Sequence, residues 1–153
     1  MKILLVEDEP LAQQRISNIL AKNFPSWQIV DTVQSVKEFK KSWETIPDID
    51  LILCDIHLAD GLSFNAFKGI KVEAPVIFIT AYDQYALQAF DHKCIDYVLK
   101  PIEESRLVQA CQKAIQFKSS PINQEFISSF LANYSQKTYK KRFLTKLGNR
   151  FSF

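Results

Sequence analysis

Glycine and proline are scarce in this sequence, with three and six residues among 153. That scarcity excludes collagen-like and low-complexity chains. Hydrophobic residues make up 47% and charged residues 24% of the chain, which is typical of a protein with a folded core and not of a disordered segment. We therefore expect one domain of ordinary size with an appendage.

Long apolar runs are also missing. No stretch approaches the ~18 apolar residues of a membrane span. Residues 1–6 lead straight into Glu7 and Asp8 without the pattern of a signal peptide. These absences predict a cytoplasmic protein with no membrane partner.

Cysteine is rare, and the three that occur, Cys54, Cys94 and Cys111, lie far apart without a CxxC pair. This pattern indicates neither a disulfide framework nor a zinc site. We expect these side chains to be buried small hydrophobic groups.

Acidic residues are absent from the end of the chain. Residues 126–153 hold six basic residues and no acidic ones, whereas residues 1–125 hold 13 basic and 17 acidic residues. The tail is therefore predicted to belong to a different functional unit. Its basic side chains could contact DNA phosphates, but a solvated run of charge explains them equally well.

Short apolar runs alternate with amphipathic stretches along the first 118 residues, which is typical of βα units around a parallel sheet buried on both faces. The expected strands are residues 2–6, 27–32, 51–54, 76–79 and 97–99. The expected helices are residues 10–23, 35–44, 64–70, 84–91 and 104–117. The pattern predicts an α/β domain over residues 1–118.

A second pattern begins after a break rich in serine and proline at residues 119–121. Apolar residues recur at helical spacing over residues 122–134, which predicts an amphipathic C-terminal helix within a linker of residues 119–138. Residues 139–153 are basic and β-prone and indicate the first hairpin of a further domain.

Polar residues follow the ends of four expected strands. They are Glu7 and Asp8 after the first, Asp55 after the third, Thr80 after the fourth and Lys100 after the fifth. Ligands of open parallel sheets bind beyond these carboxyl ends. Singly, an acid here is often only a helix cap and a lysine only solvated. Three acids, a hydroxyl and a lysine together predict a functional site.

Three neighbouring carboxylates would repel by ~4 kcal/mol per pair at an effective dielectric of about 20, so this cluster calls for a cation. Ligands that are all oxygen favour Mg²⁺, or Mn²⁺, over Zn²⁺. A carboxylate beside a hard cation and a lysine can attack phosphorus, because both positive groups neutralise charge on the phosphoryl oxygens. Asp55 is therefore a candidate phosphoacceptor.

Five motifs resemble those of the response-regulator receiver family. They are Val6-Glu7-Asp8-Glu9, Cys54-Asp55-Ile56-His57, Asp60-Gly61, Ile79-Thr80-Ala81 and Tyr97-Val98-Leu99-Lys100-Pro101. All stand in the family's order and at its spacing across residues 1–118. The resemblance implies a doubly wound, flavodoxin-like (βα)5 sheet with strand order 2-1-3-4-5. It also implies that a sensor histidine kinase phosphorylates Asp55.

The same resemblance implies a metal site. Asp8, Asp55 and the main-chain carbonyl of His57 match the family's Mg²⁺ ligands, and Glu7 matches a position that acts through water. One departure is Ala59, where many receivers carry proline. This substitution could loosen the loop after Asp55, but it removes no reactive group.

Other matching positions imply the phosphoryl pocket and the switch. Thr80, the backbone of Ala81 and Lys100 match groups that stabilise the phosphoryl group, and Pro101 matches a proline preceded by a cis peptide bond. Thr80 and Tyr97 match the switch pair. Phosphorylation is expected to draw the Thr80 hydroxyl inward and to let Tyr97 turn from solvent towards the core. The face made by the fourth helix, fifth strand and fifth helix would then form a homodimer.

Residues 81–97 look like the LytTR-type branch of receivers, and residues 142–150 look like the opening of a LytTR DNA-binding domain. The resemblance implies a transcription regulator that binds DNA only through an output domain absent from this chain. We therefore expect the chain to be a fragment of a longer regulator or a natural truncation.

Two other functions stay open. An aspartate-nucleophile phosphohydrolase also uses a strand-end aspartate with Mg²⁺ and lysine, but its DxDx[TV] pattern is broken here by Ile56 and His57. A pseudo-receiver would keep the fold without phosphorylation, yet every expected reactive residue is present. We expect a switch and not an enzyme, although a receiver can catalyse its own phosphorylation and dephosphorylation. His57 and His92 are expected to be surface histidines.

Overall fold

Five parallel strands form one sheet in the computed structural model, which describes residues 1–46, 48–68, 70–89 and 93–119. The strands are β1 Lys2–Val6, β2 Gln28–Val33, β3 Leu51–Cys54, β6 Val76–Thr80 and β7 Cys94–Leu99. Their order in the sheet is β2-β1-β3-β6-β7, and all neighbours pair in parallel. Counted along the chain, this is the order 2-1-3-4-5, and the predicted doubly wound α/β fold is confirmed.

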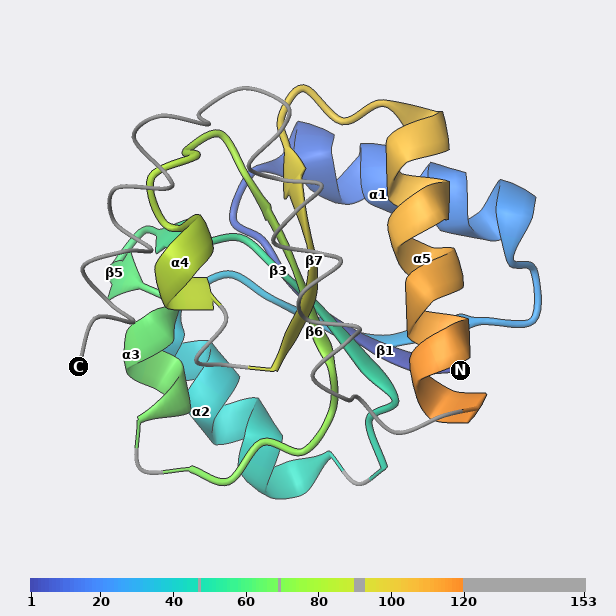
Figure 1. Ribbon diagram of the computed structural model, residues 1–153. Helices are drawn as coiled ribbons and strands as arrows, with labels where there is room; N and C mark the ends of the chain where they lie inside the picture. The colour runs from blue at the N-terminus through green and yellow to red at the C-terminus, as the bar shows by residue number, and fades with distance from the viewer. Residues whose placement is uncertain (47, 69, 90–92, 120–153) are drawn as a thin grey trace, which may run out of the picture.

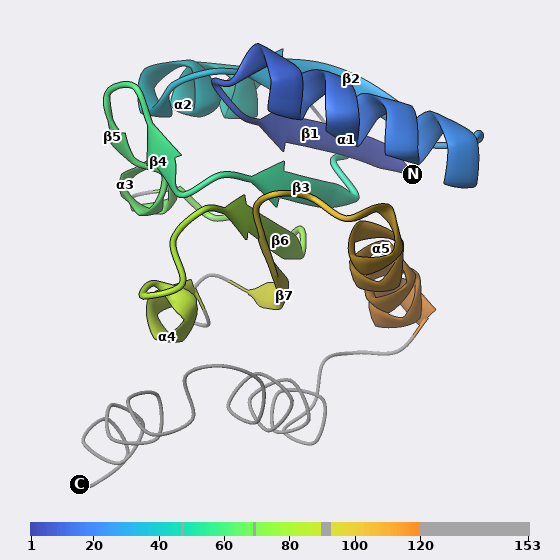
Figure 2. The same ribbon diagram turned by 90° about the horizontal axis from the view of Figure 1, so that it is seen from above.

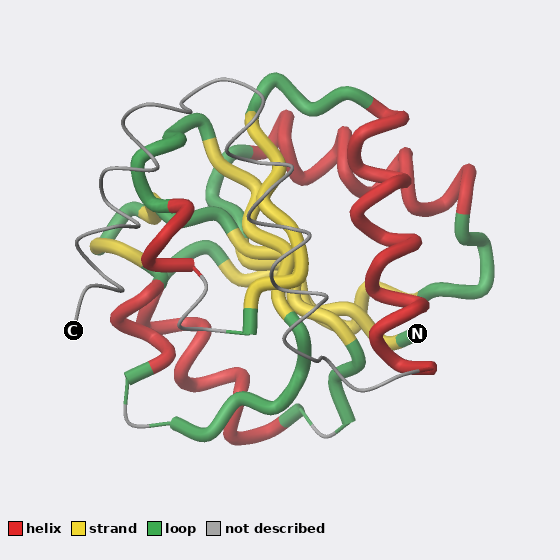
Figure 3. Tube along the Cα trace, viewed as in Figure 1, coloured by secondary structure: helices red, strands yellow, loops and turns green. Residues whose placement is uncertain are grey.

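Helices cover both faces of the sheet and make a three-layer domain (Figure 1, Figure 2). On one face lie α1 Pro10–Asn23 and α5 Glu104–Ser119, and on the other α2 Val36–Thr45, α3 Phe64–Phe67 and α4 Ala86–Ala89. Figure 3 shows the strands gathered at the centre between these two groups of helices. The sheet edge beyond the strand ends is left to the connecting loops.

The core is divided into two clusters, one on each face of the sheet. In β1, Ile3 and Leu5 pack in the cluster that contains Ile16 of α1, whereas Leu4 and Val6 pack in the cluster that contains Phe39 of α2. Successive side chains of a strand point to opposite faces, so a continuous apolar run fills both clusters. Burial of the strands on both sides holds their carboxyl ends in fixed positions.

Several predicted details are confirmed. The helix predicted over residues 10–23 has those bounds, with Pro10 in its first turn. Cys54, Cys94 and Cys111 are buried and free. The peptide bond between Lys100 and Pro101 is cis. In the described part of the chain, no helix is long and apolar enough to cross a membrane.

The structure corrects other bounds. β7 begins at Cys94, three residues before the predicted start. Helix α3 ends at Phe67 and α4 begins at Ala86, so both differ from the predicted spans. A small antiparallel hairpin, β4 His57–Leu58 with β5 Gly61–Leu62, was not predicted. The predicted linker helix and the start of the further domain lie outside the described residues.

Candidate functional site

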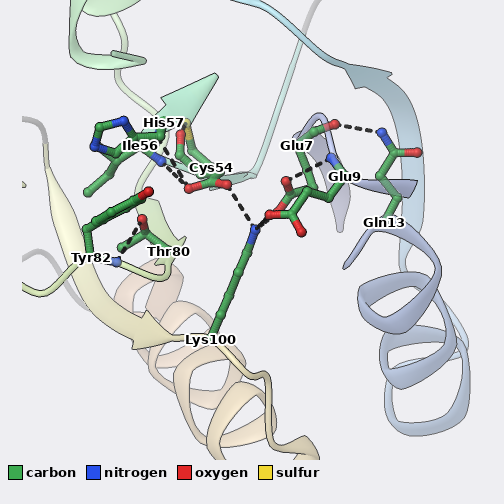
Figure 4. Close-up of polar contacts among 10 residues, drawn as sticks. Glu7, Glu9, Gln13, Cys54, Ile56, His57, Thr80, Tyr82 and Lys100 are labelled. Atoms are coloured by element: carbon green, nitrogen blue, oxygen red, sulfur yellow. Dashed lines mark hydrogen bonds and ion pairs between the residues drawn. The ribbon is translucent and has the colours of Figure 1, made fainter. Parts of the chain in front are cut away.

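The ends of four parallel strands bring the predicted polar residues to one edge of the sheet. Glu7 follows β1, Asp55 follows β3, Thr80 ends β6 and Lys100 follows β7. Lys100 Nζ lies 2.8 Å from Glu7 Oε1 and 2.9 Å from Asp55 Oδ2. Figure 4 shows the side chain of Lys100 extending towards Glu7 and Glu9. The sequence-based grouping of Glu7, Asp55 and Lys100 is thus present in the fold.

Glu9 joins this group, although the sequence assigned it no role. Lys100 Nζ lies 2.8 Å from Glu9 Oε1, and the Glu9 amide donates to Glu7 Oε2 at 3.1 Å. The Glu9 side chain is 62% exposed, whereas that of Glu7 is 1% exposed. An acid just before a helix usually suggests an N-cap, but the Glu9 side chain makes no cap hydrogen bond to α1. The sequence alone could not show that the Glu9 carboxylate contacts Lys100 and does not cap α1.

Burial controls the charge state of this cluster. The pKa of Glu7 is raised from 4.5 to about 7, chiefly by burial and also by the charge of Asp55, while contacts with Lys100 and the Glu9 amide oppose the rise. Burial alone would lower the pKa of Lys100, but the carboxylates of Glu7, Glu9 and Asp55 raise it above its ordinary value. The ammonium of Lys100 therefore stays charged, whereas the protonated form of Glu7 is favoured.

The donor set of the cluster fits a hard cation. Glu7, Asp8, Glu9 and Asp55 each offer a carboxylate oxygen, and these oxygens lie within 4.8 Å of one another. Glu7 Oε1 is buried and, in the described part of the chain, accepts no directed hydrogen bond beyond its ion-pair contact with Lys100. Oxygen ligands of this kind suit Mg²⁺ or Mn²⁺.

The loop after β3 holds Asp55 in place. The Ile56 amide donates to Asp55 Oδ1 at 2.7 Å, and the His57 amide approaches the same oxygen at 3.4 Å. One carboxylate oxygen is thus held by backbone groups while the other faces Lys100.

The side chain of His57 is half-buried and not freely exposed. Its ring centroid lies 4.1 Å from that of Tyr82, and its Nε2 lies 3.1 Å from the Tyr85 hydroxyl. Both tyrosines come from the loop after β6, which the sequence did not connect with His57. His92 lies outside the described residues.

The two residues predicted to form the switch, Thr80 and Tyr97, are buried. Thr80 is fully buried and its Oγ1 accepts a hydrogen bond from the Tyr82 amide at 3.4 Å, whereas Ala81 is exposed. Tyr97 is 2% exposed and its hydroxyl donates to the carbonyl of Tyr82. The expected solvent-facing position of Tyr97 is therefore wrong for this structure. The ring fills the core beside α4 while its hydroxyl finds a backbone acceptor.

A comparison with protein-family models agrees with this geometry. Residues 3–112 match the model described as the response regulator receiver domain. The chain belongs to the response-regulator receiver family. The match covers every site residue described above and all the buried core residues except Ala114.

Curated relatives of this receiver include LytTR-type regulators. The chain is 36% identical over 126 residues to the sensory transduction protein LytT of Bacillus cereus, and the match covers 80% of this chain and 50% of LytT. It is 33% identical over 141 residues to the transcriptional regulatory protein LytR of Staphylococcus aureus, covering 89% and 56%. The chain thus spans about half the length of these relatives.

Solved structures place the receiver among proteins of the same fold. The response regulatory domain of protein mrkE from Klebsiella pneumoniae has a TM-score of 0.68 and 31% identity, with 78% of this chain and 100% of that domain covered. A two-component response regulator from Clostridium difficile has the same TM-score, 0.68, at 23% identity, with 78% and 99% covered. The second likeness supports the fold alone.

Proposed function

We propose that this receiver is a phosphoacceptor switch in which Asp55 takes a phosphoryl group from a sensor histidine kinase with the help of Mg²⁺. The observation that carries this proposal is the position of Lys100 Nζ, 2.9 Å from Asp55 Oδ2 within a cluster of carboxylates. A strand-end aspartate with a cation site on one side and a lysine on the other is suited to phosphoryl transfer.

The chemical step is an in-line displacement. A carboxylate oxygen of Asp55 attacks phosphorus and forms an O–P bond, while the bond from phosphorus to the donor imidazole breaks and its electron pair leaves with the imidazole. Lys100 counters the charge that spreads over the phosphoryl oxygens. The Thr80 hydroxyl and the Ala81 amide, at the end of β6, donate hydrogen bonds to those oxygens.

The metal would be held by residues of the acidic cluster. We assign Asp8, Asp55 and the main-chain carbonyl of His57 as protein ligands, with Glu7 acting through water, because protein-bound Mg²⁺ usually keeps several waters. Mg²⁺, or Mn²⁺ in its place, supplies positive charge beside the transferred phosphoryl group.

Intact mass spectrometry tests this function. We expect the chain incubated with acetyl phosphate and Mg²⁺ to gain one phosphoryl group, and Asp55→Asn to gain none. Thr80→Ala, which keeps the acceptor carboxylate, should still be modified. A phosphoryl adduct that persists on Asp55→Asn would refute the assignment of Asp55.

Two alternatives predict different outcomes. An aspartate-nucleophile phosphohydrolase would turn over an added phosphomonoester such as para-nitrophenyl phosphate many times per chain, whereas the switch should not. A pseudo-receiver would gain no mass at all. The described residues keep the acceptor, the lysine and the carboxylates together, which favours the switch over a pseudo-receiver. Ile56 and His57, which break the hydrolase pattern, favour it over a phosphohydrolase.

The proposal for the whole protein rests on the relatives, whose names are those of sensory transduction and transcriptional regulatory proteins. We propose a cytoplasmic regulator with a receiver over residues 1–118, a linker over 119–138 and the beginning of a LytTR DNA-binding domain over 139–153. Phosphorylation would favour a homodimer through the face of α4, β7 and α5. Sedimentation with beryllofluoride bound at Asp55 tests the dimer, and an unchanged sedimentation coefficient would refute it.

A further inference from the structure

Asp60 joins two parts of the domain that are distant in sequence. Its Oδ1 accepts a hydrogen bond from the Val36 amide at 2.7 Å, and its Oδ2 accepts one from the Lys37 amide at 3.2 Å. Both amides belong to the first turn of α2, where backbone N–H groups have no partner within the helix. These bonds hold the pKa of the Asp60 carboxyl below its ordinary value. A loop carboxylate thus caps a helix that begins 24 residues earlier.

The same loop contains the proposed metal ligand. His57 and Leu58 form β4, which pairs with Gly61 and Leu62 of β5, so Asp60 lies in the turn of this hairpin. Gly61 has a φ of +137°, a backbone conformation that favours glycine and makes the turn possible. The Asp60 contact with α2 therefore holds the hairpin whose first residue is His57.

The contact between Asp60 and α2 is charge-assisted. Two backbone amides at the N-terminus of α2 donate to the Asp60 carboxylate, and hydrogen bonds to an ionised group are stronger than those between neutral groups. The exposed turn is thereby held to α2.

We infer that Asp60 is a positioning residue for the metal site: by capping α2 it holds the hairpin that presents the His57 carbonyl to the cation. This inference rests on the proposed function, since it assumes that the acidic cluster binds Mg²⁺. By this inference, the contact between Asp60 and α2, which lies outside the acidic cluster, affects the affinity of the cluster for Mg²⁺.

Ser35 offers a matched control. Its Oγ accepts a hydrogen bond from the Glu38 amide at 3.0 Å and caps the same turn of α2. Ser35→Ala therefore weakens the helix N-terminus without touching the hairpin. Any effect found for Asp60 and not for Ser35 belongs to the hairpin and not to the stability of α2.

The experiment is calorimetric titration of the full chain with MgCl₂. We expect Asp60→Ala to raise the dissociation constant about tenfold, as for the loss of other groups that orient metal ligands, and Ser35→Ala to leave it unchanged. Asp60→Asn keeps one acceptor oxygen, so its dissociation constant should lie between those of wild type and Asp60→Ala. This variant preserves the test if Asp60→Ala fails to fold. Hydrogen exchange at Ser63, whose amide donates to the Ile56 carbonyl at 2.8 Å across the base of the hairpin, should quicken in the Asp60 variants alone.

Two outcomes would overturn the inference by itself: wild-type affinity in both Asp60 variants, or equal weakening in Asp60→Ala and Ser35→Ala. A wild-type chain that binds no Mg²⁺ would overturn the proposed function as well. The failure of the inference and the failure of the function are therefore distinguishable.

Discussion

Glu7 and Lys100 are buried charged groups whose environments act on them in opposite directions. Glu7 is almost completely buried beside another carboxylate, and this burial favours its neutral form. Lys100 has three carboxylates around its ammonium, and they favour its charged form. A cation that enters the cluster must compete with Lys100 for the carboxylate oxygens. Substitution of Glu7 or Lys100 alone tests each group separately.

The stability of the metal-free receiver should fall with rising pH because of Glu7. Its pKa is 4.5 ordinarily and about 7 in the folded chain, so between these values the folded state binds the additional proton. The contribution of Glu7 to stability is then fully present below the ordinary pKa and is lost as pH rises through the folded pKa, a decline of up to ~3 kcal/mol. Urea unfolding in EDTA at several pH values measures this decline.

The control for that measurement is Glu7→Gln, which cannot titrate. The difference in unfolding free energy between Glu7→Gln and wild type should grow in favour of the variant from about pH 5 to about pH 8. A difference that stays constant over this range would contradict the raised pKa of Glu7.

Lys100→Ala should separate metal binding from phosphoryl transfer. Removal of the ammonium leaves the carboxylates without their counter-charge, so Mg²⁺ should bind about tenfold more tightly. Phosphorylation by acetyl phosphate should slow by about 100-fold, because charge on the phosphoryl oxygens loses its stabilising partner. Calorimetry measures Mg²⁺ affinity, and mass spectrometry measures the rate of phosphorylation. If Lys100→Ala lowered both the affinity and the rate, the two roles would not be separate.

At the scale of elements, an ion-pair cluster joins β7 to α5. Asp96 is 1% exposed, and its carboxylate accepts from both terminal nitrogens of Arg106, at 2.8 and 2.6 Å, with Lys113 at 3.2 Å. Arg106 also donates to the Tyr97 carbonyl at 3.2 Å. In the pairing of β6 with β7, Asp96 lies opposite Ile77, next to a shift in strand register between Val76 and Ile77. α5 is thus bound to β7, the strand that carries Tyr97.

Arg106→Ala should destabilise the receiver by about 3 kcal/mol, because it removes the bidentate partner of the buried Asp96 carboxylate and leaves it with Lys113 and the Tyr97 amide. Lys22→Ala is the comparison, since Lys22 joins α1 to Glu104 of α5 through an exposed pair at 3.0 Å that is worth at most about 1 kcal/mol. Chemical unfolding of both variants measures the difference. Equal losses would mean that burial of Asp96 adds nothing.

At the scale of the whole molecule, both core clusters draw their buried residues from residues 3–114. A chain ending at Ser119 should therefore unfold in a single cooperative transition and be phosphorylated at Asp55 at the rate of the full chain. Calorimetric unfolding and mass spectrometry test this domain boundary. Loss of cooperativity, or of phosphorylation, would show that the receiver needs residues beyond α5.

The long elements of the fold were predictable because their signals are local. β3 is an uninterrupted apolar run, and α1 begins at a proline and presents a regular apolar face. Helix α3 begins at Phe64 as predicted, but its end and the start of α4 were wrong, because about one helical turn carries too little periodicity to set its bounds. The start of β7 was missed because Asp96 interrupts the apolar pattern, and its partners Arg106 and Lys113 follow only in α5.

The sequence by itself determined which groups reach the functional edge. Apolar runs end in Glu7, Asp55, Thr80 and Lys100, and parallel strands bring such ends together. Only the tertiary structure decided that Glu9 pairs with Lys100, that Tyr97 lies inward and that Asp60 caps α2. Each of these depends on side-chain directions between segments up to 91 residues apart. Packing sets those directions, and the spacing of residues along the chain does not.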